Sequence, residues 1–372
     1  MPLKILYVIT STTRGGAEHT LLKLATGLDR KICEPVCVVS LKKSGPVADD
    51  IAKLGIPVKT LSMGQIPSPK HAAQLTEIIK KYKPDIVHAF LYRAIQFARF
   101  ALKGENIKFI SSPRVNYRTR PYTLRMIDRL SRTENELVIC ESDATRDFLI
   151  RSMDYNPKQA ITIRNGVDTK LWKFSAKLRA EKRAQLGLVK DELFIVSAGR
   201  LDAQKGHSYL VEAFALADRD GVKAKLAIVG DGPLKSSLQK LASKNGMETS
   251  VLLPGEQPDI LPWLCAADIF VLPSLWEGTP NALLEAMSVG LPCVASDVDG
   301  VGEVARNVVD AMLVPPRDAQ ALARAICRLA GSGKLRKELG GTARARAESA
   351  FSIDKMFRAY EQAYAQFHKT PQ

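Results

Sequence analysis

The chain has 372 residues, of which 46% are hydrophobic and 25% are charged, and its formal net charge is +15. This length exceeds what one hydrophobic core usually serves, so we expect two domains, and the composition excludes a low-complexity or disordered chain. No apolar run approaches the roughly 20 residues that cross a membrane. The six cysteines lie mostly inside apolar runs, and no signal-peptide pattern is present. These features together predict a reduced, cytoplasmic location.

Short β-branched runs alternate with helical patterns along the chain, which is typical of parallel sheets covered by helices on both faces. The first half contains the expected strands KILYVIT, PVCVVSL, PVKTLSM, DIVHAF, KFISSP and ELVICES. After AITIRNGVD, a second series comprises LFIVSAGR, KLAIVGDG, VLLPGE, DIFVLPS, PCVASD and AMLVPP. We therefore predict an α/β fold with two Rossmann-like, doubly wound domains at residues 1–168 and 169–351, followed by an amphipathic helix at about residues 352–372.

Such sheets bind ligands beyond the carboxyl ends of their strands, so two facing domains would hold a ligand in the cleft between them. After the first strand, Gly15 and Gly16 stand immediately before a helix, where the missing side chains would let a diphosphate approach the backbone. The string G-x-G-x-x-G follows neither first strand, so a dinucleotide-dependent dehydrogenase loses its main support.

Positive charge is concentrated in the first half of the chain. Through Lys170 there are 28 Lys and Arg against 16 Asp and Glu, whereas the remainder has 26 against 23. A helix expected from Pro121 would place Arg125, Arg129 and Arg132 on one face. That face favours contact with anionic lipid, and an ordinary amphipathic helix with a solvated basic face is the alternative. Nucleic acid is not expected as a partner, because the region lacks interleaved aromatic residues and nucleic-acid motifs.

The stretch VSAGRLDAQKGHSYLVEAF ends a strand and begins a helix near Gly206, which leaves Arg200 and Lys205 in the connecting loop. Two cations, a glycine and the N–H groups of a helix start together form an anion site. The alternative is a solvated loop with two surface charges. Another glycine-rich turn, Gly230 to Pro233, is either a tight turn alone or part of a nucleotide pocket.

The stretch PSLWEGTPNALLEAM also runs from a strand into a helix. We expect Thr279 to be the N-cap and Pro280 to take the first helical position. The N–H groups of Asn281 and Ala282 would then face a phosphate in the cleft.

Two glutamates flank this helix start. Glu285 lies about one turn inside the helix, where its carboxylate would accept hydrogen bonds from a neutral polyol, and Glu277 stands in the loop beside the phosphate-facing end. The alternatives are a solvated helix surface for Glu285 and stabilisation of the helix dipole by Glu277.

Along the whole chain, these motifs resemble the retaining glycosyltransferases of family 4, which have the two-domain GT-B architecture. The resemblance depends on RGGAE, PDIVHAF, IRNGVD, GRLDAQKG, the stretch ADIFVLPSLWEGTPNALLEAMSVGLPCVASDVDGVGEV and the C-terminal helix. It implies an N-terminal domain that binds the acceptor, to which the C-terminal helix returns. It also implies a C-terminal domain that binds a nucleotide-sugar donor, for which a UDP-sugar is expected.

The resemblance further implies roles for individual residues. Arg200 and Lys205 would hold the donor diphosphate, and Gly16 would contact the phosphate from the N-terminal side. Glu285 would bind the ribose hydroxyls and Glu277 would face the donor sugar. The implied catalytic residues are Glu277, Arg200, Lys205 and His88, and the implied donor-binding residues are Gly15, Gly16, Asn165, Gly199, Gly230, Gly232, Pro280, Asn281, Ala282 and Glu285.

The chain departs from the family pattern at two places. Family members often carry H-x-H where this chain has His88, Ala89 and Phe90, and a histidine after the next strand where it reads ISSPRVNYR. Arg114 or Asn116 would take the place of that acceptor-side histidine. For His88, a buried, hydrogen-bonded structural role is as well supported as a catalytic one.

The expected reaction is a metal-independent transfer of a sugar to a hydroxyl acceptor, lipid-linked or in polysaccharide or glycolipid synthesis, with retention at the anomeric carbon. No metal or other cofactor is expected: Cys33 and Cys37 lack the further ligands of a zinc site, and Asp297-Val298-Asp299 is interpreted as a loop. Two alternatives are a nucleotide-sugar 2-epimerase on a similar fold and a sensor that binds nucleotide-sugars without turnover.

Overall fold

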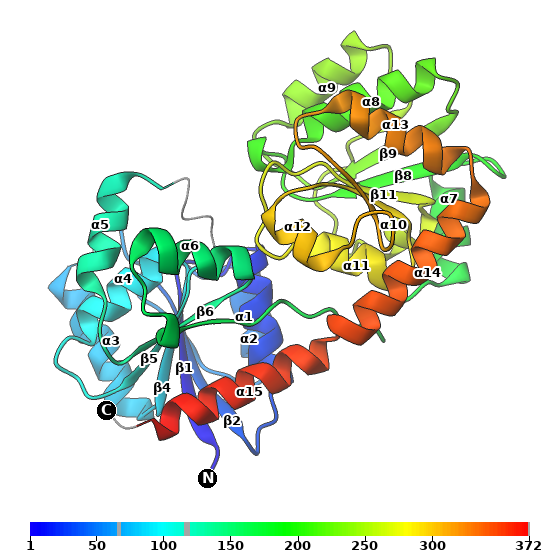
Figure 1. The fold of residues 1–372 in the computed structure, drawn as a ribbon. Coiled ribbons are helices and arrows are strands. Elements are labelled where there is room, and N and C mark those ends of the chain that lie inside the picture. The colour runs from blue at the N-terminus through cyan, green and yellow to red at the C-terminus, as the bar shows by residue number, and fades with distance from the viewer. Residues whose placement is uncertain (65–67, 115–119, 371–372) are drawn as a thin grey trace. The chain divides into compact units, whose positions relative to one another are not determined.

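The computed structural model describes residues 1–64, 68–114 and 120–370, and the chain divides into two compact units (Figure 1). Unit 1 comprises Met1–Asn165 and Asp354–Gln372, and unit 2 comprises Gly166–Ile353. Each unit has its own parallel sheet, with helices between successive strands. The predicted α/β class with two Rossmann-like units is confirmed.

Within the described residues, the sheet of unit 1 has seven strands in the order β3-β2-β1-β4-β5-β6-β7. The strands are β1 (Leu3–Ile9), β2 (Cys33–Ser40), β3 (Val58–Thr60), β4 (Ile86–Phe90), β5 (Lys108–Ser112), β6 (Glu136–Cys140) and β7 (Ala160–Thr162). All the strands expected in this half are present, and β7 forms inside AITIR, which had no strand assigned. The register between β1 and β2 shifts between Ile5 and Leu6, next to Pro35, because proline has no N–H to donate to the ladder.

The helices of unit 1 alternate with these strands. They are α1 (Gly16–Gly27), α2 (Pro46–Ala52), α3 (Pro69–Tyr82), α4 (Tyr92–Ala101), α5 (Tyr122–Ser131), α6 (Asp143–Met153), the short 3-10 helix η2 (Pro157–Gln159) and the C-terminal α15 (Ile353–Lys369). The C-terminal helix belongs to unit 1 and crosses the strands of its sheet (Figure 1). Its Glu361 Oε1 accepts a hydrogen bond of 2.8 Å from the Asp29 N–H.

Unit 2 has a sheet of six described strands in the order β10-β9-β8-β11-β12-β13. These are β8 (Leu193–Ala198), β9 (Ala224–Val229), β10 (Val251–Leu252), β11 (Ile269–Leu272), β12 (Cys293–Ser296) and β13 (Met312–Val314). The helices are α7 (Ala176–Gln185), the 3-10 helix η3 (Ala203–Lys205), α8 (His207–Arg219), α9 (Lys235–Lys244), α10 (Leu261–Ala266), α11 (Asn281–Val289), α12 (Asp299–Val304), α13 (Ala319–Ala330) and α14 (Gly333–Ala350).

Two hydrophobic cores lie on opposite faces of the unit 2 sheet. Phe194 and Val196 of β8 pack in one core, whereas Ile195 packs in the other, as the alternation of side chains along a strand requires. Both faces of the strand are therefore buried, which explains its continuous apolar sequence. In the part of the chain that the structure describes, no helix has the length and apolar character needed to span a membrane.

Candidate functional site

The carboxyl edge of the unit 2 sheet gathers the motifs predicted from the sequence. Strands β9, β8 and β11 are neighbours in the sheet, so the loops that follow them, which begin at Gly230, Gly199 and Pro273, leave the same edge side by side. The loop after β8 contains Arg200 and Lys205, and the loop after β11 contains Glu277. Residues more than 70 positions apart thus reach one place because three parallel strands end together.

Lys205 and Glu277 form an ion pair between these two loops. Lys205 Nζ lies 2.5 Å from Glu277 Oε1, and the same oxygen accepts a 2.7 Å hydrogen bond from Ser274 Oγ. The Glu277 side chain is only 7% exposed and that of Lys205 20% exposed. A carboxylate with two donors on one oxygen is fixed in orientation, because charge-assisted hydrogen bonds are the stronger ones.

A second pair of contacts connects the same loops through the backbone. Gln204 Nε2 donates to the Trp276 carbonyl at 3.0 Å, and the Leu275 N–H donates to the Gln204 carbonyl at 2.7 Å. Sequence reasoning did not identify Gln204 or Ser274 as members of this site. Their local sequence does not indicate a role in the site, because each contributes through a contact with a residue that the sequence alone does not place beside it.

Arg200 is exposed and turned towards its own loop. Its Nε and Nη2 both lie 2.6 Å from Asp202 Oδ2, and the Arg200 side chain is 70% exposed. Asp202 also caps η3, because its Oδ1 accepts from the Lys205 N–H at 3.3 Å. Asp202 therefore positions both predicted cations, and its signal in the sequence was an Asp three residues before Lys205, the spacing of a helix cap.

Gly206 is required where the loop turns into α8. Its φ of 61° is left-handed, and a Cβ built there would lie 2.1 Å from the Pro273 carbonyl oxygen. Gly300 of α12 is equally confined, since its Cβ would lie 1.3 Å from the Gly278 carbonyl oxygen, in the loop that carries Glu277. Both glycines let backbone segments approach closer than any side chain allows.

Helix α11 begins one residue later than predicted. Pro280 is the N-cap, with φ −76° and ψ 101°, and Asn281 is the first helical residue. The assignment of Thr279 as N-cap was wrong because the extended ψ of Pro280 keeps it outside the helix. Gly290 closes the helix with φ 86°. Glu285, half-buried, lies in the second turn.

His207, the first residue of α8, is buried beside Lys205. It is 2% exposed, and neither ring nitrogen has a hydrogen-bond partner among the described residues. Burial, helped by the neighbouring charge of Lys205, lowers the pKa of His207 to about 3. The ring is therefore neutral at physiological pH.

In unit 1, Gly15 is the N-cap of α1 and Gly16 its first residue, as the sequence indicated. A carboxylate already occupies this helix start: Glu18 Oε1 accepts a 3.0 Å hydrogen bond from Ser11 Oγ, and Glu18 Oε2 would lie 2.6 Å from a Cβ at Gly15. A negative charge near a helix N-terminus is stabilising. Glu18, the last residue of RGGAE, was not among the predicted site residues.

His88 is fully buried between β5 and α15. Its Nδ1 lies 2.8 Å from Tyr364 Oη and its Nε2 lies 2.9 Å from Ser112 Oγ, while its ring stacks on Phe90 with a centroid distance of 4.2 Å. Burial, with a smaller effect of Arg114, holds the pKa of His88 well below its usual range. These contacts favour the structural alternative, because both ring nitrogens are engaged inside the protein; a catalytic role for His88 stays a prediction.

Arg114 and Asn165 are brought together in unit 1. Arg114 Nη1 donates to Asn165 Oδ1 at 2.5 Å, and its Nη2 donates to Tyr360 Oη. Asn165 Oδ1 also lies 3.4 Å from Thr20 Oγ1 of α1. Asn116, the other predicted acceptor-side residue, lies outside the described residues.

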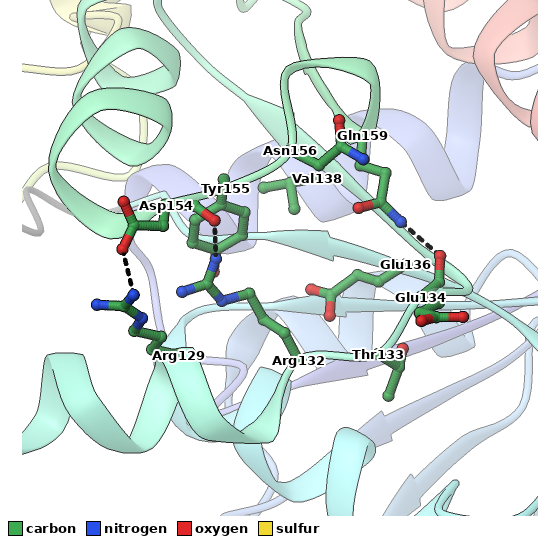
Figure 2. Close-up of a pocket in the computed structure, with 10 residues that line it drawn as sticks. All are labelled: Arg129, Arg132, Thr133, Glu134, Glu136, Val138, Asp154, Tyr155, Asn156 and Gln159. Atoms are coloured by element: carbon green, nitrogen blue, oxygen red, sulfur yellow. Dashed lines mark hydrogen bonds and ion pairs between the residues drawn. The ribbon is translucent and has the colours of Figure 1, made fainter.

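The predicted basic face of α5 is partly neutralised. Arg129 Nη2 lies 2.6 Å from Asp154 Oδ2, and Arg132 Nη1 donates to the Asp154 carbonyl at 2.8 Å. Figure 2 shows both side chains reaching Asp154, and all three residues line a pocket of about 370 Å³, with Arg132 beside the Tyr155 ring. Beside the exposed Thr123 and Arg129, three apolar residues of α5 are also exposed: Tyr122 is 69%, Ile127 50% and Leu130 80% exposed.

In the described ranges, no group of three or more His, Cys, Asp or Glu side chains is placed to hold a metal ion. The predicted site residues of unit 2 therefore comprise an ion-paired cation and carboxylate, an exposed arginine and a helix N-terminus, together with the glycine-rich turns at Gly199, Gly230 and Gly232.

Comparison with known proteins shows which protein family this chain resembles. A family model described as "Glycosyl transferases group 1" matches residues 179–346, and one described as "Glycosyltransferase Family 4" matches residues 14–171. The Escherichia coli UDP-Gal:alpha-D-GlcNAc-diphosphoundecaprenol alpha-1,3-galactosyltransferase is 29% identical over 307 residues, which cover 77% of this chain and 78% of that protein. The putative glycosyltransferase EpsF of Bacillus subtilis is 27% identical over 355 residues, 90% of each protein.

Solved structures show the same fold. Anabaena HepE in complex with UDP-glucose superposes with a TM-score of 0.88 at 22% sequence identity, covering 98% of this chain and all of that one. The glycosyltransferase WaaG, involved in lipopolysaccharide biosynthesis, gives a TM-score of 0.76 at 15% identity over 97% of this chain and 99% of that chain. With one family model on each half of the sequence, the chain belongs to the group 1, family 4 glycosyltransferases of the GT-B fold.

Proposed function

We propose that this glycosyltransferase moves a hexosyl group from a UDP-sugar to a hydroxyl of a sugar or lipid-linked acceptor, with retention at the anomeric carbon and without a metal ion. The observation that carries the proposal is the Lys205–Glu277 pair beside Arg200 at the carboxyl edge of the unit 2 sheet. The E. coli relative is named for UDP-Gal and a diphosphoundecaprenol-linked acceptor, and HepE was solved with UDP-glucose; these names support the proposed donor and acceptor classes.

Arg200 and Lys205 are proposed to bind the donor diphosphate. Arg200 needs only to turn from Asp202, since its side chain is 70% exposed. The N-terminus of α11, which begins at Asn281 and Ala282 after Pro280, adds backbone N–H groups and the positive end of the helix dipole. Glu285 would accept hydrogen bonds from the ribose hydroxyls. For Gly15, Gly16 and Asn165, contact with the donor stays a prediction.

The chemistry requires stabilising a diphosphate leaving group. Each charge-assisted hydrogen bond contributes roughly 1.5–3 kcal/mol and a helix terminus up to about 2 kcal/mol. Two cations and one helix end would then contribute about 5 kcal/mol or more, on the order of three to four decades in rate. This sum supports transfer without a metal ion.

Retention follows from attack on the face that the diphosphate leaves. The acceptor oxygen forms the new bond to the anomeric carbon as the carbon–oxygen bond to phosphate breaks, and the acceptor proton passes to the departing phosphate oxygen. Glu277 is proposed to orient the donor sugar and not to attack it, because its Oε1 is already held by Lys205 and Ser274. A trapped glycosyl adduct on Glu277 would overturn this assignment.

Thermal-shift screening against UDP-, GDP- and ADP-sugars, with and without EDTA, tests the donor proposal, because a bound ligand raises the melting temperature. We expect stabilisation by UDP-sugars, no effect of EDTA, and loss of stabilisation in Arg200→Ala. Incubation with a UDP-sugar alone separates the alternatives: interconversion of the sugar without acceptor indicates an epimerase, and binding without any slow hydrolysis indicates a sensor.

We also propose that the protein is cytoplasmic and associates peripherally with the inner face of the membrane through α5. Because Asp154 engages Arg129 and Arg132, the exposed Tyr122, Ile127 and Leu130 would supply apolar burial in the interface. Sedimentation with anionic and neutral liposomes tests this. We expect binding that Leu130→Ser weakens, and indifference to lipid in both proteins would contradict the proposal.

A further inference from the structure

A pocket of about 720 Å³ opens at the carboxyl edge of the unit 1 sheet. It lies where the neighbouring strands β3 and β2 end and where α4 begins after β4. Sequence motifs did not mark this place. Its lining residues come from the loops after β2 and β3 and from the first turn of α4, and are Lys42, Lys43, Ser62, Met63, Gly64 and Arg93.

The walls of this pocket are fixed by backbone contacts. The Lys42 N–H donates to the Thr10 carbonyl at 3.1 Å, and the Met63 N–H donates to the Leu41 carbonyl at 2.7 Å. Arg93 Nη2 donates to the Gly64 carbonyl. The loops after β1, β2 and β3 and the start of α4 are thus joined to one another, so the pocket is formed before any ligand arrives.

Three cations, Lys42, Lys43 and Arg93, line this pocket. None of its described lining residues is Asp or Glu, and neither Lys42 nor Lys43 has an ion-pair partner in the described part of the chain. Both lysines line the same pocket because the backbone bends through Leu41–Lys43 immediately after β2. Like charges held together repel one another, and an anion placed between them relieves that repulsion.

We infer that this pocket binds a phosphate or diphosphate group of the acceptor, an inference that rests on the proposed function. A concave, pre-formed pocket suits a small group better than a flat lipid surface does. Lys42 and Lys43, which have no ion-pair partner among the described residues, suit a group with two negative charges, whereas a single carboxylate would balance only one of them. Lysines act as point charges and accept phosphate in many orientations.

Titration calorimetry with inorganic pyrophosphate tests the pocket directly. Saturating UDP is included so that the donor site is occupied. We expect Lys42→Ala/Lys43→Ala to bind pyrophosphate at least about tenfold more weakly than the unaltered protein, which corresponds to about 1.4 kcal/mol. Lys80→Ala/Lys81→Ala removes two exposed lysines from α3 of the same unit and should leave the affinity unchanged. Equal affinity in all three proteins, or equal loss in both variants, would overturn the inference.

A transfer assay then connects the pocket to the acceptor. With a diphosphate-linked N-acetylglucosamine as acceptor, the Lys42/Lys43 variant should raise the acceptor KM at least about tenfold, with an unchanged donor KM and unchanged slow hydrolysis of the UDP-sugar. With the methyl glycoside, which has no phosphate, the variant and the unaltered protein should behave alike. An acceptor KM that rises equally for both acceptors contradicts the inference.

Competition identifies the source of the phosphate. Displacement of pyrophosphate by farnesyl diphosphate supports a lipid carrier, displacement by glucose 1-phosphate supports a soluble sugar phosphate, and failure of both overturns the inference. A different result would contradict the proposed function but not the phosphate pocket: the unaltered protein binds pyrophosphate but no UDP-sugar.

Discussion

The carboxyl edges of the two sheets handle positive charge differently. In unit 2, Lys205 and Arg200 already meet the carboxylates of Glu277 and Asp202, so the loops are ordered by internal ion pairs. In unit 1, Lys42 and Lys43 line an open pocket without an acidic residue among its described walls. At the edge of unit 2, a bound anion must therefore replace a carboxylate that already pairs with each cation. At the edge of unit 1, a bound anion would meet two lysines that line a pocket without an acidic residue among its described walls. The first edge favours orientation and selectivity, and the second favours capture of an anion.

The largest expected effect on stability comes from a buried ion cluster inside unit 1. Its charges stabilise the fold, whereas those at the sheet edges are proposed to bind ligands. Arg99 of α4 lies 3.0 Å from Asp128 of α5 and 2.7 Å from Glu136 of β6, and all three side chains are at most 3% exposed. Arg99→Met would leave two buried carboxylates without their cation. We expect a loss of about 3–5 kcal/mol in the free energy of unfolding, measured by urea denaturation.

Arg151→Met is the matched control for the Arg99 variant, because Arg151 is exposed on α6 of the same unit. A change within about 0.5 kcal/mol is expected there. If Arg99→Met proves as mild as this control, then the buried cluster does not hold α4, α5 and β6 together.

The ion pair of unit 2 should matter for transfer more than for folding. Under the proposed function, Lys205→Met removes a cation from the developing diphosphate charge and should lower kcat by about 10²–10³-fold, or roughly 2.7–4 kcal/mol. Steady-state kinetics measures this effect. Lys223→Met removes an exposed lysine paired with Asp218 at 3.3 Å and should change kcat little; a comparable fall in both variants would contradict the role of Lys205.

The sequence indicated which residues of the candidate unit 2 site lie near one another, because they belong to short motifs at strand ends. Arg200 and Lys205 are five positions apart, and Glu277 and Glu285 eight, so local spacing places each pair near one loop or helix start. Thr279 failed as the N-cap because the backbone angle of Pro280 decides the helix boundary, and residue type alone does not fix that angle.

Unit 1 was harder to predict because its contacts join distant segments. His88 owes its burial partly to Tyr364, 276 positions later, and no local pattern of the β4 region indicates that α15 will cover it. The pocket of Lys42, Lys43 and Arg93 likewise exists only because the ends of β2, β3 and β4 meet at one edge. Parallel topology was predictable from alternating patterns, whereas the side chains it brings together were not.

Gly206 tests how tightly the unit 2 loops must approach. In Gly206→Ala the new Cβ would meet the Pro273 carbonyl oxygen at 2.1 Å with φ at 61°, so the loops of Lys205 and Glu277 must separate. We expect a loss of about 1–3 kcal/mol in unfolding free energy and weaker UDP-sugar binding.

Gly221 is the control for the Gly206 variant, because it has φ 92° but nothing within 4 Å of a Cβ. Gly221→Ala therefore introduces the strain of a positive φ without a steric clash, and it should leave UDP-sugar binding unchanged. Binding that survives Gly206→Ala would show that the Lys205–Glu277 contact tolerates a wider loop.

The smallest effect is a pH dependence that the two buried histidines share. The pKa of His207 is lowered to about 3 and that of His88 is also well below its usual range, chiefly by burial. Below the unfolded pKa of about 6.5, the unfolded chain binds protons that the folded chain does not, so stability falls as pH falls. Between pH 7.5 and 5.5, His207 should remove about 1.4 kcal/mol from the free energy of unfolding, and His88 should act in the same direction.

His207→Leu should abolish the contribution of that histidine while leaving the one from His88, so the loss of stability between pH 7.5 and 5.5 is expected to be smaller by about 1.4 kcal/mol. Its ring nitrogens have no hydrogen-bond partner among the described residues, so the replacement should also raise stability at pH 7.5, by about 1 kcal/mol. Urea denaturation at the two pH values measures both effects. If His207→Leu destabilises the protein at pH 7.5, the ring must make a polar contact that compensates its burial. The loop beside Lys205 would then be held by that contact as well as by the carboxylates of Glu277 and Asp202. The loop of unit 2 would therefore differ from the one that carries Lys42 and Lys43 in unit 1 by more than its ion pairs.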